Sequence, residues 1–355
     1  MKLIIDADFG LMNDDAWATL LALKDPRAEV LGVTVVAGNF DVSSEYRNAT
    51  EVLSRAGYPE VPVLMGASTP LVHVRGPWED RVWGGWDRDR AERAREGTPQ
   101  PGAVEFILEQ ARAHPGEVSV LAIGPLTNLA LALREEPALP HLLDRIVVMG
   151  GSIDGLPHGG GNVTPSAEFN IWVDPEAARA VFRSGARLLL VPLNATRLAK
   201  FTEADLERIV AAPGPIADLF REHILPAYAQ PPGTYHRESL YEYALCDPLT
   251  LACLMEPDVC TTKMMFVEVE IGSVLAYGTT YGYVIGEQAP PEMPHPERVE
   301  WMKRKHLAAP NAWAWTGLIL PDHPPYWTTP PAELEVVVDV DVEAFRRWFL
   351  DTLTS

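Results

Sequence analysis

Acidic side chains gather close to the start of the chain. Asp6 and Asp8 follow the apolar residues Leu3–Ile5, and Asp14 and Asp15 come shortly after them. Carboxylates at such short spacing repel one another unless a cation neutralises them, and an all-oxygen set of ligands suits a hard divalent ion such as Ca²⁺ or Mg²⁺. The stretch therefore predicts a site for a divalent cation.

The apolar run before these acids predicts a buried parallel strand, and open α/β sheets carry their sites at the carboxyl ends of such strands. A helix is expected over residues 14–23. Acids are favourable at the positive N-terminal end of a helix, so Asp14 and Asp15 could instead be ordinary cap residues. Asp6 and Asp8 have no such alternative explanation.

Apolar runs and segments of helical periodicity alternate along the chain, which predicts an α/β fold with a mostly parallel, doubly wound sheet flanked by helices. Broken helices are expected over residues 202–243, and an antiparallel hairpin over 267–271 and 281–285. The other expected strands lie at residues 30–36, 61–65, 118–123, 146–149, 187–192 and 334–340, and the other helices at 43–56, 103–112, 175–184 and 341–353.

We expect residues 1–355 to form a single domain with a Pro/Trp-rich insertion at about 286–331. The insertion holds paired prolines and several tryptophans, which makes it too aromatic for a disordered linker. A second irregular stretch, over residues 67–102, is also rich in Gly, Pro and Trp. Loops of this length in a domain are usually functional, so the two could line a substrate pocket.

The composition excludes several classes of function. The net charge is −20, with 49 acids against 29 bases, which disfavours nucleic acid and anionic membranes as partners. The three cysteines, Cys246, Cys253 and Cys260, form no Cys-x-x-Cys pair, so no zinc site or disulfide framework is indicated. With no long apolar segment and no room for a signal peptide before the first strand, we expect a cytoplasmic protein.

Amides and further acids follow the later strands. Asn39 ends the second expected strand, and the glycine-rich stretch 159–170 carries Asn162, Glu168 and Asn170. Amide and carboxylate groups together can recognise the vicinal hydroxyls of a sugar, although the same residues are common in plain turns. Asp247 precedes a proline and could therefore be a helix N-cap.

Together these motifs make the chain resemble the inosine-uridine-preferring nucleoside hydrolase family. They occur in the same order as in the family and extend over roughly residues 1–285. The resemblance implies a Ca²⁺-dependent enzyme that uses water to cleave the N-glycosidic bond of a ribonucleoside, giving ribose and free base. It also implies a homodimer or homotetramer. The motifs are Asp6–Gly10, Asp14–Asp15, Val35–Asn39, Gly124–Asn128, Met149–Gly151, Glu168–Asn170 and Asp247–Pro248.

The resemblance also implies a role for each matching residue. The calcium ligands would be Asp8, Asp15, Asp247 and the main-chain carbonyl of Ile123, and Asp8 would also act as the general base. Asp6 would lie behind these ligands, and Met149 would lie close to the sugar. The residues that would hold the ribose hydroxyls are Asp14, Asn39, Asn162, Glu168 and Asn170.

The chain departs from the common family pattern in three places. Phe9 replaces a frequent proline, the 286–331 insertion lengthens the chain, and Cys246 stands where well-studied members have the histidine that helps to protonate the departing base. The chain thus resembles a cysteine-bearing subset. The thiol could donate a proton or could simply pack in an apolar setting. Other candidate acids are His73, Asp80, His236 and Tyr241.

Two alternatives belong to other classes of function. A catalytically silent nucleoside- or ribose-binding protein would keep the metal and sugar sites but lack leaving-group activation, as Cys246 suggests. A haloacid-dehalogenase-like phosphatase would use the Asp6-x-Asp8 pattern for an aspartyl nucleophile and Mg²⁺. The phosphatase also needs a lysine at a later strand end, and no lysine follows a clear core strand here.

Overall fold

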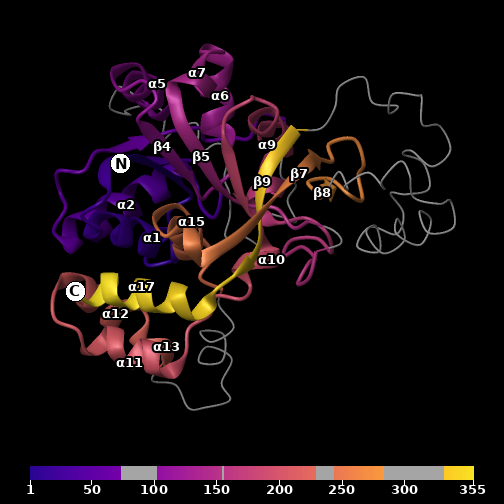
Figure 1. Ribbon diagram of the computed structural model, residues 1–355. Helices are drawn as coiled ribbons and strands as arrows, with labels where there is room; N and C mark the ends of the chain where they lie inside the picture. The colour runs from indigo at the N-terminus through magenta and orange to yellow at the C-terminus, as the bar shows by residue number, and fades with distance from the viewer. Residues whose placement is uncertain (73–101, 154–155, 229–243, 284–331) are drawn as a thin grey trace, which may run out of the picture.

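The computed structural model describes residues 1–72, 102–153, 156–228, 244–283 and 332–355 (Figure 1). Within these ranges a single nine-stranded sheet forms the centre of the fold. Its strands are β1 (Lys2–Ala7), β2 (Glu29–Val35), β3 (Val63–Met65), β4 (Val118–Ala122), β5 (Leu143–Met149), β6 (Leu188–Val191), β7 (Cys260–Val269), β8 (Thr280–Tyr283) and β9 (Ala332–Val340).

The strand order is β3-β2-β1-β4-β5-β6-β9-β7-β8. All pairs from β3 to β9 are parallel, whereas β7 runs antiparallel to both β9 and β8. The order reverses direction at β1, and such a switch point is where open α/β sheets form their sites. The predicted mostly parallel sheet is confirmed, and so is the β7–β8 hairpin as far as Tyr283.

Helices cover both faces of this sheet. The longer ones are α1 (Asp14–Lys24), α2 (Val42–Ala56), α5 (Ala103–Ala113), α6 (Thr127–Glu135), α9 (Pro175–Phe182), α11 (Glu203–Ala211), α12 (Pro215–His223), α15 (Cys246–Met255) and α17 (Val342–Thr354). Short ones are α7 (Leu139–Leu142), α8 (Phe169–Val173), α10 (Leu193–Thr196), α13 (Leu225–Tyr228) and a 3₁₀ turn at Pro257–Val259.

Two helix starts differ from simple cap predictions. Asn13 caps α1, with its side chain accepting from the backbone N–H of Ala16, so Asp14 and Asp15 lie in the first turn instead. Leu245 is the cap residue of α15, so Asp247 lies inside the helix, and the alternative that Asp247 is an N-cap is excluded. Both helices therefore present first-turn acids that are not needed as caps.

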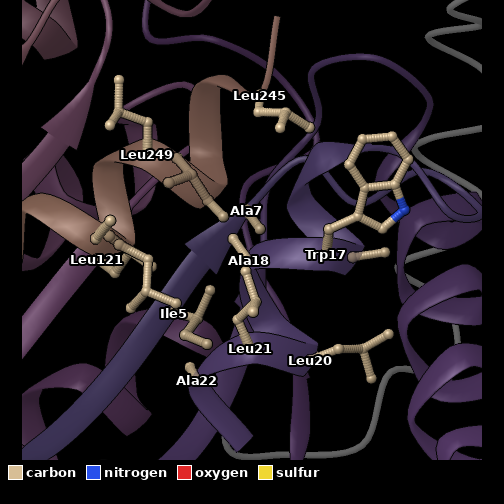
Figure 2. Close-up of a cluster of buried hydrophobic side chains, with 14 of the residues drawn as sticks. Ile5, Ala7, Trp17, Ala18, Leu20, Leu21, Ala22, Leu121, Leu245 and Leu249 are labelled. Atoms are coloured by element: carbon tan, nitrogen blue, oxygen red, sulfur yellow. The ribbon is translucent and has the colours of Figure 1, made fainter. Parts of the chain in front are cut away.

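The core has two layers because side chains alternate along each buried strand. Ile5 and Ala7 of β1 pack under α1, α2 and α15, whereas Ile4 packs with α5, α6 and α9 on the opposite face. Helices α1 and α15 contact each other directly. Figure 2 shows the meeting point of β1, α1 and α15, where the buried side chains include Ile5, Ala7, Trp17, Ala18, Leu20, Leu21, Leu121, Leu245 and Leu249.

Several predictions lie outside the described residues. These are the insertion at 286–331, the tryptophan-rich part of the 67–102 stretch, and the alternative acids His73, Asp80, His236 and Tyr241. In the part of the chain that the structure describes, no helix is long and apolar enough to span a bilayer.

Candidate active site

Asp8 follows β1 directly and is enclosed by the loops that follow β2 and β4. The backbone N–H of Asn39 donates to Oδ2 of Asp8 at 2.8 Å, and the Asn39 side-chain amide donates to the Asp8 carbonyl at 3.3 Å. A Cβ atom at Gly38 would lie 2.3 Å from Oδ2 of Asp8, and one at Gly124 would lie 2.7 Å from its backbone nitrogen. Glycine is therefore required at both positions for the strand ends to close around Asp8.

Three more carboxylates meet beside Asp8 because α1 and α15 begin at the same place. Carboxylate oxygens of Asp14, Asp15 and Asp247 lie within 4.8 Å of one another. Asp15 is held in place from two sides: Oδ1 accepts from the backbone N–H of Asp8 at 3.2 Å, and Oδ2 accepts from the Asn13 side chain at 2.6 Å. The predicted acidic cluster is thus brought together in space.

The cluster is electrostatically strained. Burial raises the pKa of Asp8, Asp15 and Asp247 well above the usual range, and the neighbouring carboxylates raise each pKa further. Asp14 contributes to the repulsion at all three. Such a group must either take up protons or bind a cation, and its all-oxygen chemistry fits a hard divalent ion.

The main-chain carbonyl of Ile123, directly after β4, accepts a hydrogen bond from a predicted sugar residue. The side-chain amide of Asn170 donates to this carbonyl at 2.9 Å and approaches the Met149 carbonyl at 3.2 Å and its sulfur at 3.4 Å. Asn170 and Met149 are both buried. The predicted metal ligand Ile123 and the two predicted sugar residues are therefore in direct contact.

Glu168 is the N-cap of α8 and is almost fully buried. Its Oε1 accepts from the backbone N–H of Asn170 at 2.9 Å, and its Oε2 accepts from those of Gly151 and Ile171 at 2.9 and 3.1 Å. Burial raises the pKa of Glu168, while these backbone donors lower it. The side chain thus fixes Asn170 and the Gly151 turn in addition to any contact with a sugar.

Asn162 differs from the other predicted sugar residues because its side chain is exposed. Its backbone N–H donates to the Ala167 carbonyl at 3.1 Å, which closes the glycine-rich loop. Arg197 holds the preceding turn, donating to the carbonyls of His158, Gly159 and Gly161 at 2.8, 2.9 and 3.0 Å. The loop is therefore anchored to the end of α10 rather than to the carboxylate cluster.

Asp6 lies behind the cluster and is completely buried. Its Oδ1 accepts from the Thr34 hydroxyl at 2.6 Å and from the Asn128 side chain at 2.7 Å. Burial raises the pKa of Asp6 to about 6. Asn128 also accepts from the backbone N–H of Ala67 at 2.8 Å, so this network joins the ends of β1, β2 and β3.

Cys246 begins α15 and lies beside the cluster. Burial raises the pKa of its thiol well above the usual range, the charges of Asp14 and Asp247 raise it further, and the nearby Thr196 side chain opposes them. The thiol is therefore neutral at physiological pH. A thiol with so high a pKa is a weak acid, which favours the packing role over proton donation.

Glu45 is an acid that the sequence interpretation did not single out. It lies in the first turn of α2, is fully buried, and its Oε1 accepts from the backbone N–H groups of Gly38 and Phe40. A signal was present, since Glu45 shares a helical face with Ala49 and Val52, both of which are buried. A charged residue in an apolar stripe suggests a specific role.

A doubly wound sheet with a polar cluster at its strand ends is typical of α/β proteins that carry their functional site at this edge. The model of the inosine-uridine preferring nucleoside hydrolase family matches residues 3–347, and the chain belongs to this family. It is accordingly a nucleoside N-ribohydrolase, an enzyme that hydrolyses the bond between the base and the ribose.

Relatives support this assignment in sequence and in structure. Uridine nucleosidase 1 of Arabidopsis thaliana is 36% identical over 281 residues, covering 76% of this chain and 78% of that protein. The pyrimidine-specific ribonucleoside hydrolase RihA of Salmonella paratyphi A is 37% identical over 285 residues, covering 79% and 88%. A solved plant nucleoside hydrolase superimposes with a TM-score of 0.75 at 27% identity, covering 100% of this chain and 99% of that one.

Proposed function

We propose that the protein is a calcium-dependent ribonucleoside hydrolase with a preference for pyrimidine ribonucleosides. The observation that carries the calcium dependence is that two of the proposed ligands, Asp15 and Asp247, lie within 4.8 Å of each other and of Asp14, and that the buried Asp8 is joined to Asp15 through its backbone N–H. Their raised pKa values require a positive partner when the carboxylates are ionised. The names of the uridine- and pyrimidine-specific relatives support the choice of base.

In this proposal Asp8, Asp15, Asp247 and the Ile123 carbonyl hold the calcium ion. When bound, the ion would neutralise the repulsion between the carboxylates and acidify a water molecule. Asp8 takes the proton from the attacking water, because it lies at the centre of the strand ends and is oriented by Asn39.

Charge development on the sugar explains the remaining acids and amides. As the base departs, the ribose becomes oxocarbenium-like and positively charged. Carboxylates and amide oxygens placed around it stabilise that charge and hold the hydroxyls. We assign this work to Asp14, Asn39, Asn162, Glu168 and Asn170, with Met149 against the sugar. The departing base also needs a proton donor: burial of Cys246 favours packing over that role, and the other candidates in the sequence are His73, Asp80, His236 and Tyr241.

Release of reducing sugar from uridine, cytidine, inosine and adenosine tests the proposal, with calcium added and again with chelator. We expect release from the pyrimidine nucleosides that chelator abolishes and calcium restores. Release that is unaffected by a chelator would overturn the calcium role. Tight nucleoside binding in calcium without any release would instead support a silent binding protein.

Asp8→Asn provides the matching variant, since it removes the base and one charge of the cluster. We expect turnover to fall by about 10³-fold or more while the protein stays folded. Asp341→Asn is the control, because asparagine caps a helix as well as aspartate and Asp341 caps α17 away from the cluster. Near-native activity of Asp8→Asn would refute the assignment.

We also propose a cytoplasmic homodimer or homotetramer, as the family resemblance implies. The three cysteines indicate no disulfide framework, which is consistent with a reducing compartment. Light scattering on the purified protein tests the assembly, and a monomer at micromolar concentration would contradict it. Fractionation of the source cells tests the compartment.

A further inference from the structure

The loop that follows β2 is held by a buried carboxylate. Glu45 is completely buried, and its Oε1 accepts from Gly38 at 3.1 Å and from Phe40 at 2.9 Å. These two N–H groups flank Asn39 in the sequence. One carboxylate oxygen therefore fixes the backbone on both sides of a predicted sugar residue.

The same short segment sets the position of Asp8. The Asn39 N–H donates to Oδ2 of Asp8 at 2.8 Å, and the Gly38 backbone comes so close that a Cβ atom there would lie 2.3 Å from that oxygen. A small shift of the segment would either break the hydrogen bond or push into the Asp8 carboxylate. The orientation of Asp8 thus depends on the path of residues 38–40.

A carboxylate in this place carries an electrostatic penalty. Burial raises the pKa of Glu45, and the charges of Asp8 and then Asp15 raise it further. Its second oxygen, Oε2, has no hydrogen-bond partner among the described residues. The side chain is nevertheless kept there as an acceptor, because Oε1 receives two backbone N–H groups that would otherwise be buried without a partner.

We propose that Glu45 is a positioning residue for calcium binding and catalysis, acting through the 38–40 backbone to hold Asp8 and Asn39 in their working orientation. This inference rests on the proposed function. Partners that orient a metal ligand from outside the coordination sphere typically change metal affinity or activity by about 10–100-fold when removed. The effect of Glu45 should lie in that range.

Two variants separate the acceptor from the rest of the side chain. Glu45→Met keeps the length and burial but removes the acceptor for Gly38 and Phe40. Glu45→Gln keeps an acceptor oxygen and removes the charge. We expect Glu45→Met to lower calcium affinity, measured by titration calorimetry, and kcat at saturating calcium by about 10–100-fold each. Glu45→Gln should restore both to within a few-fold of the wild type.

Val52→Ala is the matched control, because Val52 is buried in the same helix and takes no part in the hydrogen bonds that Glu45 makes to Gly38 and Phe40. It lowers the stability of α2 but should leave calcium affinity and kcat unchanged. If Glu45→Met does not fold, Glu45→Asp takes its place, since the shorter side chain withdraws the acceptor while keeping the charge. A loss in Glu45→Asp that Glu45→Gln does not share supports the positioning role.

Three results would overturn the inference: wild-type calcium affinity in Glu45→Met, an equal loss in Glu45→Gln and Glu45→Met, or an equal loss in Val52→Ala. The failure of the proposed function itself looks different. In that case the wild-type protein would neither bind calcium in the calorimeter nor release ribose in a calcium-dependent manner, whatever stands at position 45.

Discussion

The side-chain amide of Asn170 donates to the main-chain carbonyl of Ile123 across 2.9 Å. Family resemblance assigns Asn170 to the sugar and Ile123 to the calcium ion, so this single hydrogen bond joins the two predicted subsites. Glu168 fixes the backbone of Asn170 in turn. The arrangement predicts that a substitution of Asn170 changes catalysis on the substrate and calcium affinity to different extents.

Asn170→Ala should lower kcat/KM for uridine by about 10²-fold, because an amide oxygen that helps to stabilise the positive charge on the sugar in the transition state is lost. Calcium affinity should change less than about tenfold, since the Ile123 carbonyl remains in place. Steady-state kinetics and titration calorimetry on the same sample check both values. Equal losses of metal affinity and catalysis would contradict the separation of the two roles.

Cys246→Ala and Cys246→Ser should keep kcat within about tenfold of the wild type. A general acid typically contributes about 10²–10⁴-fold, and burial raises the pKa of the thiol, which makes it too weak an acid for that task. The pH dependence of kcat should also be unchanged in both variants. A loss of about 10²-fold with an altered alkaline limb would instead identify Cys246 as the proton donor.

Calcium-free protein should become less stable as the pH rises. Burial raises the pKa of Asp6 from 3.8 to about 6, and Asp8, Asp15 and Asp247 shift in the same direction. A carboxyl whose pKa is higher in the folded state stabilises that state below its unfolded pKa, and the contribution disappears as the pH passes the folded value. Asp6 alone should lower the free energy of unfolding by about 3 kcal/mol as the pH rises from below 3.8 to above about 6.

Urea unfolding in chelator at pH 5 and pH 8 measures this effect. The free energy of unfolding should be lower at pH 8, and added calcium should raise it more at pH 8 than at pH 5, because metal ligands must be deprotonated. Asp6→Asn should remove its share of the pH dependence. Greater stability of the calcium-free protein at pH 8 would contradict the assigned pKa directions.

Most of the fold could be predicted from the sequence because the strands that build it are short apolar runs with clear boundaries. The run ending at Ile5 became the buried strand β1, and the acids behind it reached the strand ends as expected. Helix starts were harder to place. A polar residue before an apolar helix looks like a cap, yet Leu245, and not Asp247, occupies that position in α15.

The candidate site was predictable where residues close in the sequence stay close in space, as with Asp8, Asp14 and Asp15. Contacts between distant loops were not. Glu45 reaches the Gly38 turn only because of how α2 packs, and Asn128 joins three strand ends through the Asp6 network. Tertiary packing determines such contacts, and the periodicity of the local sequence predicts them only weakly.

Arg197 gives the last prediction, on the loop that carries Asn162. Its guanidinium donates from two nitrogens to the carbonyls of His158, Gly159 and Gly161. Arg197→Met should free the loop and raise KM for nucleoside by about tenfold, with little change in kcat, because the reacting groups lie elsewhere. Arg208→Met is the control, since Arg208 pairs with Asp351 on α17 instead. An unchanged KM in Arg197→Met would show that Asn162 does not depend on this clamp.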